Sequence, residues 1–139
     1  MGRYVIPFFT FTMLWISVFS TDVLANEELS REEILQQRMA YYIHFGEFLV
    51  PWYYLAAIDQ YERNIQSVRS DIPKRDSVIA IQFSEEYWNG PLNSTDGDSP
   101  TSDISYFGGV GLDGNGDGIA DRNNDEDIMY TMASYLSQF

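Results

Sequence analysis

The segment Leu112–Asp127, LDGNGDGIADRNNDED, constrains the fold of this chain more than any other feature. It alternates oxygen-bearing side chains with glycines and reaches a turn glycine, Gly118, at its sixth position counted from Asp113. Oxygen ligands at positions 1, 3 and 5 with a glycine at position 6 are what a hard cation requires from one short loop. We therefore predict a structural calcium site, with these ligands: Asp113, Asn115, Asp117, the main-chain carbonyl of Ile119, and Asp121 directly or through water.

The loop departs from the EF-hand pattern at its last position. An EF-hand has a bidentate Glu at position 12, and this chain has Asn124 there. Asp125 or Asp127 would have to complete the coordination of the cation. The alternative interpretation of the same residues is a solvated acidic turn that binds no metal.

The charge and residue content exclude several classes of function. The net charge is −13, and the residues after Phe83 hold eleven acidic side chains against one basic side chain, Arg122. Such a surface repels phosphate backbones, so we expect no nucleic-acid partner. The chain has no cysteine and one histidine, His44, which excludes disulfides, a cysteine nucleophile and a multi-histidine zinc site built from this chain alone.

The first 25 residues have the features of an export signal. Arg3 precedes an apolar run over residues 5–19, and Val23-Leu24-Ala25 offers a cleavage site. An uncleaved membrane anchor is the alternative, and it would be the chain's one contact with a membrane. We expect residues 26–139 to form one domain outside the cytoplasm, secreted or associated with the cell wall.

The domain is predicted to be mainly α-helical. Ser30-Arg31-Glu32-Glu33 fits a capping box that begins a helix at Arg31, and Gly46 is expected to end it. The apolar residues Ile34, Leu35, Met39, Tyr42 and Phe45 are predicted to form its buried face. The remaining predictions are a helix that Pro51 opens, a strand or helical turn over residues 78–83, a loop over residues 93–105, and a last helix through Met129, Met132 and Leu136.

Glu62 is a candidate catalytic acid. It shares a helix face with Leu55, Ile58 and Ile65, near the helix C-terminus. Burial and the negative end of the helix dipole would both raise the pKa of its carboxyl. A carboxyl that stays protonated near neutral pH is what glycoside cleavage requires of a general acid. The alternative is a surface ion pair with Arg63 or Arg69.

Three pieces of the chain resemble a known family of enzymes: PWYYLAAIDQYER, IQFSEEYW and LDGNGDGIADRNNDEDIMYTMASYL. Together they resemble the lytic transglycosylases, in particular the membrane-bound lytic transglycosylase B group, which have a goose-type-lysozyme-like fold. The chain is also similar to the N-terminal part of some Bacillus-type cell-wall hydrolases, in which a peptidase domain follows. The resemblance implies a lysozyme-like helical domain that is incomplete at its C-terminus and whose partner is the glycan strand of peptidoglycan.

The resemblance also implies roles for individual residues. Glu62 would be the single general acid and base that cleaves the bond between N-acetylmuramic acid and N-acetylglucosamine and leaves 1,6-anhydromuramoyl ends. Gln82 would hydrogen-bond the sugars, and three aromatic side chains could stack against them: Phe83, Tyr87 and Trp88. The alternative for each of these aromatic side chains is a place in the hydrophobic core.

Two other functions fit the sequence. Arg63 follows Glu62 where the family has Ser, and Ile79-Ala80-Ile81 replaces its Gly-x-Met. These departures favour a non-catalytic, calcium-stabilised module that binds the cell wall or another partner. A secreted calcium-binding protein without a glycan partner is the third hypothesis.

Overall fold

The computed structural model describes residues 29–47, 49–93 and 99–139. The described part is mainly helical, which confirms the predicted class; the calcium loop and the lysozyme-like arrangement stay predictions. The helices are α1 (Arg31–Gly46), α2 (Trp52–Val68), α3 (Glu85–Asn89), α4 (Thr101–Tyr106) and α5 (Asp125–Leu136), and the strands are β1 (Ser99–Pro100) and β2 (Ile119–Ala120).

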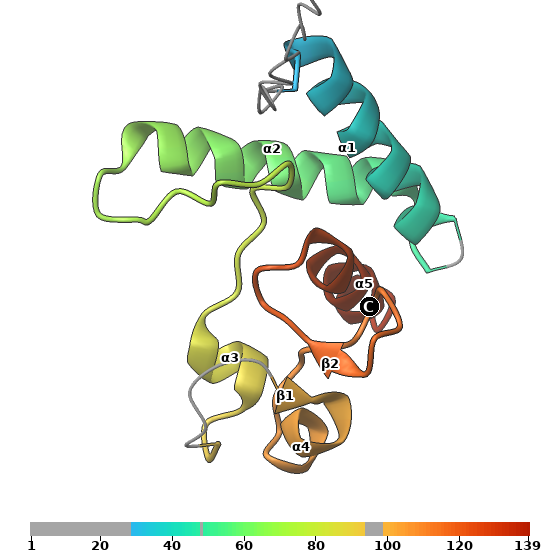
Figure 1. Cartoon of the computed structure of the whole chain (residues 1–139), viewed down its shortest axis with the longest axis vertical. Helices are drawn as coiled ribbons and strands as arrows, with labels where there is room; N and C mark the ends of the chain where they lie inside the picture. Colours follow the sequence, from blue (N-terminus) through green and yellow to red (C-terminus); the bar gives the residue numbers. More distant parts are fainter. Residues whose placement is uncertain (1–28, 48, 94–98) are drawn as a thin grey trace, which may run out of the picture.

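The long helices lie together at one end of the molecule (Figure 1). Helix α1 packs against α2 and α5, and α2 also contacts α5. The short helices α3 and α4 pack on each other at the other end, next to the two strands. Strand β1 pairs with β2 in antiparallel orientation, with Ser99 opposite Ala120. The chain between α2 and α3 runs back along α2 before it descends to α3 (Figure 1).

Helix α1 begins where its capping box predicts. The Ser30 hydroxyl accepts from the Glu33 amide at 3.2 Å, and the Glu33 carboxylate accepts from the Ser30 amide at 2.7 Å. The predicted buried face was wrong in part, because Leu35 and Met39 are 50% and 43% exposed. Both lie within about 60° of Tyr42 around the helix, but the buried residues of α1 all lie near its C-terminal end, so the covered part of the helix is shorter than the pattern predicted.

The hydrophobic core joins all parts of the described chain. Its fully buried side chains come from α2, the extended segment, and helices α3 to α5: Leu55, Ile79, Ile81, Trp88, Ile104, Ile128 and Met129. Trp88 donates its indole N–H to the Ala120 carbonyl at 3.3 Å. Gly111 must be glycine, because a Cβ there would lie 2.6 Å from the Trp88 ring.

The segment between α2 and α3 is neither a strand nor a helical turn, so both predictions for residues 78–83 were wrong. It is extended, and side chains of α2 rather than a neighbouring strand satisfy its main chain. Asp59 accepts from the Ala80 amide at 2.5 Å, and Gln66 donates to the Ala80 carbonyl at 2.6 Å. Ile79 and Ile81 are therefore buried without belonging to a sheet.

Two other sequence predictions meet the structure differently. The expected loop over residues 93–105 contains β1 and all of α4 but its last residue, because Ile104 is fully buried and anchors a helical turn. Residues 94–98 lie outside the described residues. The predicted export signal, residues 1–25, also lies outside them. Within the described ranges, no helix has the length and apolar character needed to cross a membrane.

Candidate functional site

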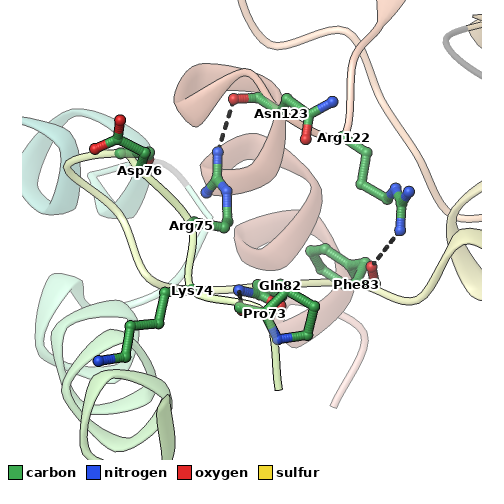
Figure 2. A pocket seen from close by; sticks show the side chains of 9 residues that line it. Pro73, Lys74, Arg75, Asp76, Gln82, Phe83, Arg122 and Asn123 are labelled. Atoms are coloured by element: carbon green, nitrogen blue, oxygen red, sulfur yellow. Dashed lines mark hydrogen bonds between the residues drawn. The ribbon is translucent and has the colours of Figure 1, made fainter. Parts of the chain in front are cut away.

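A pocket of about 370 Å³ lies between the α2–α3 segment and the chain just before α5 (Figure 2). We call it the basic pocket, because three of the chain's eight Lys and Arg residues line it. Its lining residues are Pro73, Lys74, Arg75, Asp76, Ser77, Gln82, Phe83, Arg122 and Asn123. Another pocket of the described chain, of about 530 Å³, is also lined by three arginines, but Arg63 there is paired with Asp59 and Arg38 donates to the Val78 carbonyl.

Arg75 is the structural frame of the basic pocket. Its side chain is 10% exposed and forms an ion pair with Asp125 at 3.0 Å. Its guanidinium also donates to the main-chain carbonyls of Asn123 at 2.7 Å and Ile79 at 3.0 Å. Arg75 thereby ties the extended segment to the first turn of α5. Because its donors are engaged with the protein, it shapes the pocket more than it offers charge to a ligand.

The other two cations are less engaged. Arg122 donates to the Phe83 carbonyl at 3.3 Å, and its pair with Glu85 is long, at 3.5 Å. Lys74 is exposed and belongs to none of the ion pairs among the described residues. Figure 2 shows the Lys74 ammonium at the rim, pointing away from the two guanidinium groups. The pocket therefore has two cations with donor capacity to spare.

The predicted sugar-binding residues divide between pocket and core. Gln82 and Phe83 line the basic pocket, and Gln82 donates to the Pro73 carbonyl at 2.8 Å. Trp88 is 1% exposed and its ring fills the core, which is the alternative expected for this side chain and leaves no face for a sugar. Tyr87 is 44% exposed and stacks against Phe83, with ring centroids 6.3 Å apart.

Glu62 lies half-buried on α2 and is not among the residues that line the basic pocket. Burial is the main cause that raises the pKa of its carboxyl, and the nearby Asp59 carboxylate raises it further. The sequence thus indicated the direction of the pKa shift, although a neighbouring charge contributes where a helix dipole had been expected. Glu62 is not brought together with Gln82 and Phe83 in that pocket.

Asp59 is a buried residue whose importance the sequence did not reveal. It is 1% exposed and accepts from the Tyr42 hydroxyl at 2.6 Å, from Arg63 at 2.9 Å and from the Ala80 amide. Arg63 therefore pairs with Asp59 and not with Glu62. The spacing from Asp59 to Arg63, four residues on one helix, was the available signal.

The acidic loop is tightly organised. The Asp113 carboxylate accepts from the amides of Gly116 at 2.6 Å and Gly118 at 2.7 Å. Gly118 has a φ of 92°, which suits the sharp turn predicted at this position. The loop closes on Asp127, which is fully buried and accepts from the amides of three loop residues: Gly114, Asn115 and Asp121.

The expected metal ligands fit a cation in type, and the structure directs most of them to main-chain donors. Asn115 accepts from the Asp117 amide at 2.9 Å, and Asp117 from the Ile119 amide at 2.8 Å. Within the described ranges, no three acidic or histidine side chains converge as a metal site. Asn124, at the position of the EF-hand Glu, is the N-cap of α5 and accepts from the Glu126 amide at 2.8 Å.

The cations of the basic pocket come from two distant parts of the sequence. Lys74 and Arg75 belong to a polar stretch that follows α2. Arg122 was the one basic residue after Phe83. Because 47 positions separate Arg75 from Arg122, only the fold reveals that they line the same pocket.

Comparison with known proteins gives one informative similarity. The chain is 39% identical over 128 residues to an L-Ala–D-Glu endopeptidase of Bacillus subtilis (strain 168), a match that covers 91% of this chain. The chain spans 39% of the length of that relative. No family model matches the chain. No solved structure gives a significant match.

This similarity corrects the functional prediction. The resemblance to lytic transglycosylases was wrong, because the similar protein carries the name of an endopeptidase for a peptide bond and not of an enzyme for glycan strands. The predicted cleavage of the glycan by Glu62 was wrong with it. The motifs behind that prediction, a helix with a half-buried Glu and a glycine-rich acidic loop, are local features that more than one fold can accommodate. The chain is similar to part of a longer endopeptidase.

Proposed function

We propose that this chain serves an exported cell-wall endopeptidase as the part that holds the peptide stem of peptidoglycan. The observation that carries the proposal is the 39% identity with an L-Ala–D-Glu endopeptidase over 128 residues. A bond between L-Ala and D-Glu is a feature of peptidoglycan stems, so the substrate is a wall peptide. The apolar run at residues 5–19 supports a location outside the cytoplasm.

A holding role suits the residue content of the chain better than catalysis. The sequence contains no cysteine and a single histidine, so it supplies neither a cysteine nucleophile nor a multi-histidine zinc centre. Ser77 lines the basic pocket, but its hydroxyl is bonded to the Asp125 carboxylate and no histidine lines that pocket. The pocket therefore offers recognition groups rather than an activated nucleophile.

Retention by purified cell walls tests the proposal. The chain is incubated with intact sacculi and with sacculi whose peptide stems have been removed by an amidase. We expect the chain to sediment with intact sacculi and to stay in solution with the bare glycan. Equal sedimentation with both would overturn the peptide-directed function and would indicate recognition of the sugars.

We also propose that calcium binds the acidic loop as a structural brace. The support is the D-x-N-x-D-G spacing from Asp113 to Gly118 and the positive φ of that glycine. Asp113, Asn115, Asp117, the Ile119 carbonyl and Asp121 would hold the ion. A bound cation would neutralise part of the loop's negative charge and would thereby stabilise the contact of the loop with α5.

A further inference from the structure

We infer that the basic pocket binds a free carboxylate of a D-glutamyl peptide, with Arg122 and Lys74 as the groups that recognise it. The inference rests on the proposed function, which supplies the peptide class, and it adds the site and the recognition chemistry. Glutamate has two carboxyl groups. Whichever of them continues the peptide, the other remains as a carboxylate unless it is amidated.

The charge distribution restricts where such a ligand can bind. A carboxylate is repelled by most of a surface that carries a net charge of −13. The basic pocket gathers Lys74, Arg75 and Arg122 against one lining carboxylate, Asp76. Arg75 is already paired with Asp125, so the positive charge open to a ligand is that of Lys74 and Arg122, and the surrounding acidic surface disfavours extended polyanions more than a small anion.

The two recognition groups are suited to a carboxylate in different ways. Arg122 has five N–H donors, of which one faces the Phe83 carbonyl at 3.3 Å and one faces Glu85 at a weak 3.5 Å. A carboxylate that enters the pocket can replace the distant Glu85 as the partner of this guanidinium. Lys74 is exposed at the rim, and its long flexible side chain can turn inward to a second oxygen.

The remaining walls are fixed before any ligand arrives. Arg75 is held by Asp125 and three main-chain carbonyls, so it fixes the α2–α3 segment against the chain at the start of α5. Phe83 closes one wall of the pocket from the hydrophobic core, where it is 9% exposed, and the Gln82 amide is anchored on the Pro73 carbonyl. The volume of about 370 Å³ falls in the range of small-molecule sites, about 300–1,000 Å³.

Calorimetric titration with two synthetic peptides tests the inference. One is N-acetyl-L-alanyl-D-glutamic acid in which one of the two carboxyl groups is amidated and the other is free. The other peptide is amidated at both carboxyl groups. We expect the acid to bind the chain at least about fivefold more tightly than the diamide, because a charge-assisted hydrogen bond contributes about 1 kcal/mol or more. The difference should shrink as salt is added. Equal binding of the two peptides would overturn the inference.

Matched variants locate the site. Arg122→Met and Lys74→Met should each weaken binding of the acid about fivefold without changing the diamide, and Glu85→Gln should tighten it by freeing Arg122. Arg31→Met removes an exposed cation at the start of α1 and should change nothing. The inference fails if both pocket variants bind the acid normally or if Arg31→Met is equally harmful. Lys74→Met decides the matter should Arg122→Met unfold, because Lys74 is exposed.

Two further measurements distinguish this inference from a general anion site and from the proposed function. Inorganic phosphate that binds as tightly as the peptide acid would show a general anion site and would overturn the assignment to a peptide.

Sedimentation of the same variants with intact sacculi separates the inference about the basic pocket from the proposed function. If stem-dependent sedimentation is unchanged in both pocket variants, the proposed function holds and the assignment of the carboxylate site to the basic pocket is wrong. If the wild-type chain sediments equally with and without the peptide stems while the peptide titrations give the expected difference, the proposed function fails and the inference about the basic pocket stands.

Discussion

The Tyr42 hydroxyl donates a 2.6 Å hydrogen bond to the Asp59 carboxylate in the interior, and this bond joins α1 to α2. Asp59 is 1% exposed, so it depends on its donors to offset the cost of burying a charge. Burial, together with this bond and the charge of Asp59, raises the pKa of Tyr42. The hydroxyl therefore remains protonated, and a donor, throughout the neutral pH range.

Tyr42→Phe is expected to destabilise the protein by about 1–3 kcal/mol, because it leaves part of a buried carboxylate unsatisfied. Chemical denaturation measures the loss. Tyr53→Phe removes the hydroxyl of a tyrosine that is 53% exposed on α2, and it should change stability by less than about 0.5 kcal/mol. Equal effects of the two substitutions would show that the Tyr42 bond contributes nothing specific.

Glu62→Gln is expected to stabilise the protein at neutral pH and to have little effect in acid. The folded-state pKa of Glu62 is raised above its ordinary value of 4.5, so the folded protein favours the protonated carboxyl. The stability from this group is present below pH 4.5 and is lost as the pH rises through the folded-state pKa. Denaturation from pH 3.5 to 7.5 should show the two curves diverging upward from about pH 4.5. Curves that stay parallel would mean that Glu62 is well solvated.

The two arginine–aspartate pairs of the α2–α3 segment should differ greatly in energy. Arg75→Met breaks a pair whose side chains are 10% and 13% exposed, and we expect a loss of about 3 kcal/mol. Arg69→Met breaks a pair whose side chains are 56% and 66% exposed, and the loss should be much smaller because solvent screens this pair. Urea denaturation of the two variants gives the comparison. Similar losses would indicate that Arg75 is not the frame of the basic pocket.

Calcium is expected to raise the melting temperature by about 5 °C or more when it saturates the acidic loop, and a chelator should reverse the change. Asp113→Asn should abolish the response, because it removes the charge at the first ligand position. Asp103→Asn, at an exposed acidic residue on α4, should leave the response intact. A melting temperature that ignores both calcium and chelator would contradict the proposal of a brace.

Local patterns predicted what local forces determine. The capping box at Ser30 and the spacing on α2 depend on neighbours within one helix, and the structure confirms both helices. The extended segment could not be predicted in the same way, because its main-chain partners are side chains of α2, among them Asp59 and Gln66. No short-range pattern records such contacts.

The candidate site also divides into features that local patterns predict and features that depend on long-range packing. The sequence contained the basic cluster and the isolated Arg122, but it did not place them on one pocket, since their proximity depends on where α5 packs. The apolar face around Glu62 predicts a raised pKa for its carboxyl, and the structure agrees with that direction. The inferred role of Glu62 was wrong, because a shifted pKa indicates an environment and not a substrate.

The closure of the acidic loop on Asp127 also has a consequence for dynamics. Three amides, those of Gly114, Asn115 and Asp121, end on one carboxylate in the first turn of α5. Gly114 and Asn115 share the Oδ1 atom and Asp121 holds Oδ2, so a movement of the loop that exposes one of these amides also weakens the pairing of the buried carboxylate. Their hydrogen exchange should therefore proceed at a common rate, together with the first turn of α5, as one cooperative unit.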